Sequence, residues 1–281
     1  MPRTLKSLKT PLRYPGGKSR AVPKLLQYLP NLFQVKEFRE PFLGGGSVAL
    51  EITKRYPHID IWVNDLYEPL YNFWCELQHH GEELQDALLG IKSIYCNPDA
   101  ARCLFISSKE QINDSDLSNF DRAVAFYIVN KCSFSGLTES SSFSAQASES
   151  NFSTNGISRI TEYSEIIERW KITNISYESM LCDDKHTFIY LDPPYDIKDN
   201  LYGKKGDMHK RFDHDKFAAD CDQHTCPMLI SYNSDQIIRD RFYEWTVGEF
   251  AHTYTMRSVG CYNIDQATRK ELVLTNYEMR S

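Results

Sequence analysis

The sequence lacks the features that mark membrane-spanning, secreted and disulfide-stabilised proteins. No stretch approaches the roughly 18–20 apolar residues of a membrane-spanning helix, and no apolar segment follows the basic N-terminus. None of the eight cysteines forms a Cys-x-x-Cys pair, so a disulfide framework is not indicated. The spacing is too irregular for zinc in the one His and Cys cluster, which comprises His214, Cys221, His224 and Cys226. We expect a cytoplasmic protein with reduced thiols, no metal ion and no membrane partner.

An excess of basic residues is also missing, which by itself argues against nucleic-acid binding. The net charge is −6, and the isoelectric point is near 5.8. The charge is unevenly distributed, however. Residues 1–40 hold nine Lys or Arg and two Glu, a net +7, whereas residues 41–130 hold six Lys or Arg and thirteen Asp or Glu, a net −7. This asymmetry allows one basic face on an acidic body.

Strand and helix patterns alternate at both ends of the chain. Val35–Phe42 and Ile59–Asn64 predict strands on either side of a helix over Ser47–Arg55, and a helix from Leu66 to about His79 follows. Such β-α-β units predict a doubly wound, mostly parallel, Rossmann-like α/β sheet, here built from residues 1–80 and 171–281. The other expected elements are helices over 18–29, 158–170 and 213–223, and strands over 187–192, 227–232, 245–250, 252–257 and 270–276.

The middle of the chain, residues 81–170, predicts a mainly helical insertion into this sheet. Residues 82–131 have helical periodicity, including Asp121–Lys131. Ser133–Ser153 holds nine serines in 21 residues, and we expect a loop or an irregular hairpin there, with a flexible linker as the alternative.

A run of glycines follows the first predicted strand. Pro41-Phe42-Leu43-Gly44-Gly45-Gly46-Ser47 lies where this strand turns into a helix, and glycine there lets the backbone approach a ligand. Asp65 follows 21 residues after Gly44, at the end of the next strand, where a carboxylate can accept hydrogen bonds from a ribose. The pair indicates a nucleoside-containing cofactor. The absence of Gly-x-Gly-x-x-Gly argues against an NAD enzyme.

Asp192-Pro193-Pro194-Tyr195 ends a strand that is expected to be buried on both faces. The prolines remove two backbone N–H donors and orient the carbonyl groups of Asp192 and Pro193. A carboxylate, a carbonyl group and an aromatic ring then form a small acceptor site. That site suits an exocyclic amine on a flat heterocycle.

A third motif, Arg13-Tyr14-Pro15-Gly16-Gly17-Lys18, leads into the helix predicted over 18–29. Lys18 at this turn can bind an anionic or carboxylate group. Taken by itself, the motif indicates only a helix start with solvated charges.

In these motifs the sequence resembles the Dam-type DNA adenine-N6 methyltransferases. The matching stretches run in family order over nearly the whole chain: Tyr14-Pro15-Gly16-Gly17-Lys18, Pro41 to Ser47, Asn64-Asp65, Asn130-Lys131 through Gly136-Leu137, Asp192-Pro193-Pro194-Tyr195, Leu229-Ile230-Ser231 and Arg269-Lys270-Glu271-Leu272. The resemblance implies an AdoMet-dependent methyltransferase fold with residues 81–170 as the target-recognition domain. It also implies S-adenosyl-L-methionine as cofactor, S-adenosyl-L-homocysteine as product, double-stranded DNA as substrate and no obligate protein partner. A role in restriction-modification, at the nucleoid of a bacterial or phage-infected cell, is consistent with it.

The resemblance also implies the site residues. Asp192, Pro193 and Tyr195 would form the pocket for the target adenine, which must flip out of the duplex. The carboxylate of Asp192 and the carbonyl group of Pro193 would accept the two N6 hydrogens, with no metal and no covalent intermediate. The residues implied to hold AdoMet are Tyr14, Gly16, Gly17, Lys18, Phe42, Gly44, Gly46, Asp65 and Asp192.

The chain departs from the family pattern after Gly136-Leu137. The best-known members carry a basic residue there that helps to read GATC, whereas this chain has Thr138-Glu139. We expect Lys131–Ser158 to read the DNA sequence through its hydroxyl groups and its three phenylalanines, Phe134, Phe143 and Phe152. The alternative is that this segment is a linker and that the helices of residues 82–130 read the sequence. No arginine lies between Lys131 and Arg159, so we expect little guanine discrimination from this segment.

Two other functions fit the same motifs. An amino-methyltransferase acting on RNA or on a protein amide would use the same acceptor chemistry at Asp192. A non-catalytic DNA-binding subunit would keep the basic N-terminal region but would not need the cofactor residues.

Overall fold

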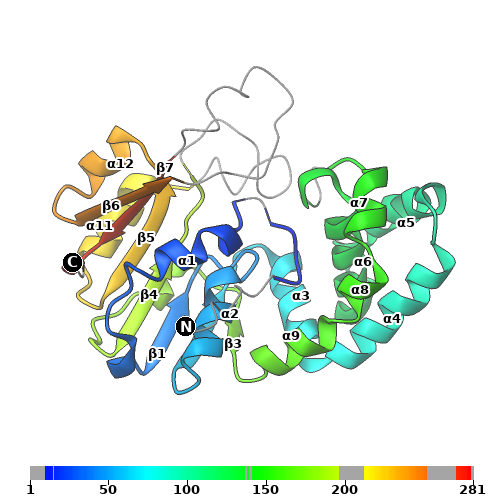
Figure 1. Cartoon of the computed structure of the whole chain (residues 1–281), viewed down its shortest axis with the longest axis horizontal. Helices are drawn as coiled ribbons and strands as arrows, with labels where there is room; N and C mark the ends of the chain where they lie inside the picture. The colour runs from blue at the N-terminus through cyan, green and yellow to red at the C-terminus, as the bar shows by residue number, and fades with distance from the viewer. Residues whose placement is uncertain are drawn as a thin grey trace, which may run out of the picture.

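The computed structural model describes residues 10–14, 16–136, 138, 141–195, 212–251 and 270–279. The predicted strand over 252–257 lies outside these residues. So do the basic residues after Tyr195, which are Lys198, Lys204, Lys205, Lys210 and Arg211. Within the described residues, a seven-stranded sheet occupies one side of the molecule and a lobe of helices the other (Figure 1).

The strands are β1 (Glu37–Glu40), β2 (Asp60–Asn64), β3 (Lys171–Thr173), β4 (Thr187–Leu191), β5 (Met228–Asn233), β6 (Thr246–Ala251) and β7 (Lys270–Thr275). The helices are α1 (Val22–Leu25), α2 (Ser47–Arg55), α3 (Glu68–His79), α4 (Gly81–Ile94), α5 (Pro98–Gln111), α6 (Asn119–Cys132), α7 (Ala145–Ser150), α8 (Thr154–Ile157), α9 (Ile160–Ile167), α11 (His214–Asp222) and α12 (Gln236–Arg241). Short 3-10 turns are η1 (Lys18–Arg20), η2 (Leu32–Gln34), η3 (Phe134–Gly136) and η4 (Tyr177–Met180).

The strand order is β3-β2-β1-β4-β5-β7-β6. The first five strands are mutually parallel, and β7 runs antiparallel between β5 and β6. Because β1 pairs with β2 on one side and with β4 on the other, the strand order reverses between β1 and β4 while the strands stay parallel. Ligands of open α/β sheets bind outside the carboxyl ends of the strands at such a point. The prediction of a doubly wound, mostly parallel sheet is confirmed.

Alternating strand residues build one hydrophobic core on each face of the sheet. Phe38, Val63 and Phe188 pack with α1, α2 and α3 on one face. Leu191 and Ile230 pack with α11 and α12 on the other. Since helices cover both faces, β4 is buried at all five positions, as its unbroken apolar sequence predicts.

The helical lobe is formed by α4 to α8, and α3 and α9 lie between it and the sheet (Figure 1). Helix α6 is buried from Ala123 to Cys132. Its Phe126 ring lies 5.6 Å from that of Phe73 on α3. The lobe therefore shares one continuous core with the helices on the sheet.

Several predicted boundaries were wrong, for local reasons. The helix expected over 18–29 is only η1 followed by one turn of α1, because Pro23 lacks the N–H needed to continue η1. The strand expected over 35–42 is limited to β1, and Pro41 follows it directly. Strand β3, with three residues, was not predicted. The described residues of Ser133–Ser153 form η3, an antiparallel bridge between Ser133 and Phe143, and α7.

Candidate active site

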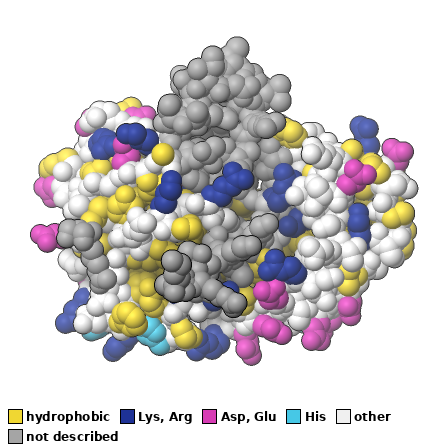
Figure 2. All heavy atoms as spheres, in the orientation of Figure 1, with side chains coloured by type: hydrophobic (Ala, Val, Ile, Leu, Met, Phe, Trp, Pro, Cys, Tyr) yellow, Lys and Arg dark blue, Asp and Glu magenta, His cyan; other side chains and the backbone are white. Residues whose placement is uncertain are grey.

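The carboxyl ends of the parallel strands gather the predicted site residues along one edge of the sheet. Gly44 follows β1, Asp65 follows β2 and Asp192 follows β4. Figure 2 shows several Lys and Arg side chains across the middle of the displayed face, while others lie along its upper and lower margins together with Asp and Glu.

The glycine loop after β1 is held by Asp65. The backbone N–H of Gly44 donates to Asp65 Oδ2 over 2.9 Å, and that of Tyr67 donates to Oδ1 over 3.0 Å. Gly44 has a φ of +50°, and a Cβ there would lie 2.8 Å from the Tyr14 ring, so only glycine fits. Burial raises the pKa of Asp65 to about 6, against the opposing effect of the two N–H groups.

A second acid, Glu40, lies at the end of β1 and is 3% exposed. Its Oε2 accepts a hydrogen bond of 2.8 Å from the N–H of Ala49, in the first turn of α2. Burial raises the pKa of Glu40 well above its usual range, and the Ala49 N–H only partly offsets this. Glu40 therefore joins the end of β1 to the first turn of α2.

Lys18 joins the N-terminal motif to the Asp-Pro-Pro-Tyr motif. Its Nζ donates to Asp192 Oδ1 over 2.8 Å and to the hydroxyl oxygen of Tyr195 over 2.5 Å. The same Nζ lies 3.2 Å from Glu271 Oε1, which accepts a hydrogen bond of 2.7 Å from the Tyr195 hydroxyl. One ammonium therefore bridges the carboxyl groups of Asp192 and Glu271.

Asp192 is anchored by one oxygen only. Oδ1 accepts from Lys18 and, over 3.1 Å, from the Ser231 hydroxyl on β5. Because that hydroxyl has a single hydrogen, Tyr190 must donate to Ser231 in the 2.8 Å contact between them. Within the described residues no hydrogen bond reaches Oδ2, and the Asp192 side chain is 20% exposed. Oδ2 is thus the oxygen available to a ligand.

Burial and the neighbouring charges shift the pKa values of both Lys18 and Asp192. Burial lowers the pKa of Lys18, but the carboxylates of Asp192 and Glu271 outweigh it, and the net shift is upward. Burial raises the pKa of Asp192, Lys18 opposes this, and Glu271 adds to it, so the net shift is again upward. The pair holds a buried ammonium and a carboxylate of increased basicity.

Comparison with known proteins shows the family of this chain. The family model of D12 class N6 adenine-specific DNA methyltransferases matches residues 14–256. The chain belongs to this family. The predicted family, fold and activity class are therefore confirmed, and a methyl-donor cofactor and a DNA substrate follow from the family.

Individual relatives are distant. The methyltransferase is 22% identical over 198 residues to the type II methyltransferase M.MjaIII of Methanocaldococcus jannaschii, covering 66% of this chain and 68% of that protein. It is 26% identical over 189 residues to the DNA adenine methylase of Vibrio cholerae, covering 66% and 64%. It is 20% identical over 282 residues to the type II methyltransferase M1.LlaDCHI of Lactococcus lactis subsp. cremoris, covering 94% of both chains. The first two matches thus span about two thirds of those relatives' lengths.

Three residues of the site were not among the predicted site residues: Glu40, Ser231 and Glu271. Ser231 and Glu271 lie within stretches that carried the family resemblance, but no role was assigned to them. Glu271 directly precedes the apolar residues Leu272, Val273 and Leu274 of β7, and it is its full burial in the structure that marks it as part of the site. Charged residues at fully buried strand positions are rare unless they are paired.

Other predicted residues lie at the rim of the site. The Phe42 ring is half-buried, 5.6 Å from Tyr177 and 5.7 Å from Phe212. The Tyr195 ring lies 5.8 Å from Tyr232 at 37°. Gly16 accepts from Lys18 through its carbonyl group, and the N–H of Gly17 donates to the carbonyl group of Tyr14, which closes the N-terminal turn.

Asn130 on α6 fastens this turn to the helical lobe. Its Oδ1 accepts from the N–H of Arg13 over 2.9 Å, and its Nδ2 donates to the carbonyl groups of Arg13 and Gly136. The Arg13 guanidinium donates to the carbonyl group of Ser133. The segment before Tyr14 and the start of the serine-rich segment are thus held together by one amide and one guanidinium.

The three phenylalanines of Lys131–Ser158 differ in accessibility. Phe152 is fully buried, so the expectation that it contacts DNA is wrong. Phe143 is half-buried, with its ring 5.7 Å from Phe105. Phe134 is 47% exposed. Of the three, Phe134 has the most exposed ring.

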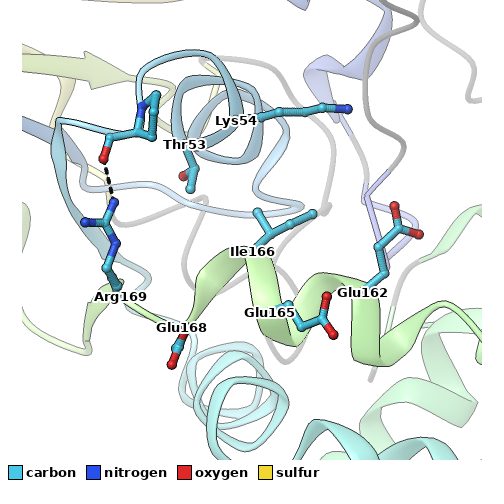
Figure 3. A pocket seen from close by; sticks show the side chains of 8 residues that line it. Thr53, Lys54, Glu162, Glu165, Ile166, Glu168 and Arg169 are labelled. Carbon is cyan, nitrogen blue, oxygen red and sulfur yellow. Dashed lines mark hydrogen bonds between the residues drawn. The ribbon is translucent and has the colours of Figure 1, made fainter.

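A separate pocket of about 410 Å³ lies between α2 and α9 (Figure 3). Thr53, Lys54 and Ile166 line it, and the Arg169 guanidinium at its rim donates to the carbonyl group of Pro57 over 2.6 Å. None of the predicted site residues lines this pocket.

Among the described residues no group of three or more His, Cys, Asp or Glu side chains could hold a metal ion. No helix in that part of the chain is long and apolar enough to cross a membrane.

Proposed function

We propose that this methyltransferase transfers a methyl group from S-adenosyl-L-methionine to N6 of an adenine flipped out of double-stranded DNA. The observation that carries the proposal is Asp192. One of its oxygens is fixed by Lys18 and Ser231, and the other is unengaged within the described residues at the carboxyl edge of the sheet. An acid held in this way presents a preorganised acceptor to an exocyclic amine.

The charge of the site suits a cationic cofactor. Lys18 is outnumbered by Asp192 and Glu271, and the Asp65 and Glu40 carboxyls lie at the ends of the neighbouring strands. When bound, AdoMet supplies an electrophilic methyl group on a sulfonium. The residues that would hold it are Tyr14, Gly16, Gly17, Lys18, Phe42, Gly44, Gly46, Asp65 and Asp192, with the Asp65 carboxylate directed to the ribose hydroxyls.

The acceptor groups act on the target nitrogen. Adenine N6 is a weak nucleophile because its lone pair is delocalised into the ring. Asp192 Oδ2 and the carbonyl group of Pro193 accept the two N6 hydrogens, which favours a pyramidal nitrogen and offsets the positive charge that develops on it. Tyr195 offers a ring face for stacking on the flipped base, while its hydroxyl is held by Lys18 and Glu271.

Lys131 supports a DNA partner. It is 9% exposed, and among the described residues no carboxylate forms an ion pair with it. Its Nζ lies 5.2 Å from the centre of the Tyr127 ring. Burial lowers the pKa of Lys131 to about 8, and the neighbouring Arg13 charge adds to this. Two adjacent cations without a carboxylate suit a phosphate group.

The proposal also covers the domain organisation of the chain and the biological setting of the enzyme. We propose that residues 1–80 and 171–281 form the catalytic domain and residues 81–170 the target-recognition insertion, with Lys131–Ser158 and its exposed Phe134 reading sequence. The names of two relatives, both type II methyltransferases, support a restriction-modification setting. A cytoplasmic, nucleoid-associated enzyme without an obligate protein partner fits this setting.

The experiment that tests this function measures the acceptor. The protein is incubated with tritiated AdoMet in three parallel reactions, which contain duplex DNA, RNA or protein as the acceptor. The labelled acceptor is then digested, and its nucleosides or amino acids are separated. We expect label in N6-methyladenine from DNA. Label confined to RNA or protein would favour the amino-methyltransferase alternative, and AdoMet binding without transfer to any acceptor would contradict the proposal.

Asp65→Ala should weaken AdoMet binding by about tenfold to a hundredfold. A charge-assisted hydrogen bond to a ribose contributes roughly 1.5–3 kcal/mol. Because the pKa of Asp65 is about 6, wild-type affinity should also fall as pH drops through 6, where the carboxylate takes up a proton. Isothermal titration calorimetry from pH 5 to 8 measures both effects. An unchanged affinity in a folded variant would place the ribose contact elsewhere.

DNA binding should weaken steeply with added salt despite the acidic isoelectric point. Phosphate contacts release counterions, so log affinity falls linearly with log salt, and six or more contacts would reduce affinity on the order of 10³-fold between 50 and 200 mM. Lys131→Met should lower the slope by about one. The matched control is Lys54→Met, an exposed lysine on α2. A flat salt dependence, measured by fluorescence anisotropy, would mean that the basic residues of this chain do not contact the DNA phosphates.

A further inference from the structure

Glu271 is a buried acid that contacts the site without facing its ligand-accessible edge. We propose that Glu271 is a positioning residue for methyl transfer, which acts through Lys18 and Tyr195 to keep Asp192 aligned and strongly accepting. This inference rests on the proposed role of Asp192 as the N6 acceptor.

The contacts form a short relay. Glu271 Oε1 lies 2.7 Å from the Tyr195 hydroxyl and 3.2 Å from Lys18 Nζ. Lys18 Nζ in turn lies 2.8 Å from Asp192 Oδ1. Glu271 is fully buried and Lys18 is 3% exposed, so water does not substitute for either partner. Among the described contacts, Lys18 and Tyr195 are the side chains through which Glu271 can influence the target amine.

The sheet itself gains little from an acid at this position. The following residues of β7 are Leu272, Val273 and Leu274, all fully buried in the two cores. Burial of a carboxylate costs several kcal/mol before pairing, and apolar residues commonly replace buried ion pairs without loss of stability. The placement of Glu271 is explained by the site, because β7 is antiparallel to β5 and its amino end lies beside the carboxyl end of β5.

The physical effect is a competition for one ammonium. If Asp192 were the only carboxylate next to Lys18, the ammonium would neutralise it and weaken it as a hydrogen-bond acceptor. Glu271 shares the ammonium and adds negative charge, which keeps Asp192 more basic. The same excess negative charge favours the positive charge that develops on N6.

The test compares Glu271→Gln with the wild type under single-turnover conditions, at saturating AdoMet and DNA. Glutamine keeps the size and an acceptor for Tyr195 but removes the charge. We expect the transfer rate to fall about tenfold to a hundredfold, as is typical when a residue that orients a ligand-contacting side chain is removed. The dissociation constants for AdoMet and DNA should change less than threefold. Glu249→Gln on β6, whose carboxylate pairs with Lys270 and Arg239, is the matched control and should retain the wild-type rate.

The pH dependence of the transfer rate distinguishes a positioning role of Glu271 from a purely structural one. The groups that face Asp192 are Lys18 from η1, Glu271 from β7, Glu40 from β1, Tyr190 from β4 and the Ser231 hydroxyl from β5. Removal of the Glu271 charge lowers the pKa of Asp192, so the acid limb of the single-turnover rate should move to lower pH. Glu271→Asp keeps the charge and should recover part of the lost rate.

Each outcome decides the matter. A Glu271→Gln rate within twofold of wild type, or a parallel loss of rate, binding and melting temperature, would overturn the positioning role. Failure of both Glu271 variants to fold would assign the residue to sheet stability and would also overturn it. Asp192→Ala is measured in the same series. If that variant stays active, the proposed function of Asp192 itself fails, whereas an inactive Asp192→Ala beside a normal Glu271→Gln removes only the present inference.

Discussion

Asp192→Ala is expected to reduce the methyl-transfer rate by 10²–10³-fold or more. The substitution removes the charged acceptor for N6, and loss of one preorganised transition-state contact has a cost on that order. It also leaves Lys18 and Ser231 without their shared partner. Single-turnover transfer of tritium from AdoMet to duplex DNA measures the rate, and fluorescence anisotropy should show that DNA binding survives.

The control for this prediction is another aspartate. Asp60 is exposed at the amino end of β2, whereas the site lies at the carboxyl ends of the strands. Asp60→Ala should therefore keep the wild-type rate. If Asp192→Ala retained more than a tenth of wild-type turnover, the assignment of Asp192 as the acceptor would be wrong.

Lys18→Met is expected to lower the free energy of unfolding by about 3–5 kcal/mol at neutral pH, the usual cost of removing one partner from a buried ion pair. Asp192 and Glu271 would then lose the ammonium that they share. Burial already raises the pKa of Asp192 in the wild type, against the opposing charge of Lys18. Loss of Lys18 would raise this pKa further, so the folded variant would bind more protons than the folded wild type. The stability deficit of Lys18→Met relative to wild type should therefore shrink as pH falls toward 5.

Urea denaturation at pH 5, 6 and 7.5 measures this effect. The control is Lys36→Met, an exposed lysine before β1, which should change stability by less than about 0.5 kcal/mol. Equal unfolding free energies for Lys18→Met and wild type at pH 7.5 would show that the ammonium does not hold the two carboxylates.

The sequence alone determined the fold class and most of the chemistry. The uninterrupted apolar run of β4 predicted a strand covered on both faces, and the structure confirms it. The glycine run, Asp65 and the Asp-Pro-Pro-Tyr motif each follow a strand, so their gathering at one edge follows from parallel pairing. Local patterns suffice for such features because period and turn chemistry are properties of short segments.

Only the tertiary structure decided how the gathered groups are paired. Lys18 and Asp192 are 174 residues apart, and the motif around Lys18 predicted an anion partner without saying which one. Glu271 reaches the site because β7 inserts antiparallel between β5 and β6, a choice of strand order that no local pattern encodes. Phe152 is buried and Phe134 exposed for the same reason, since burial depends on which distant helices pack against a segment. The sequence thus determined which chemical groups this protein has, and the packing of distant segments decided which of them are anchored, paired or left available to a ligand.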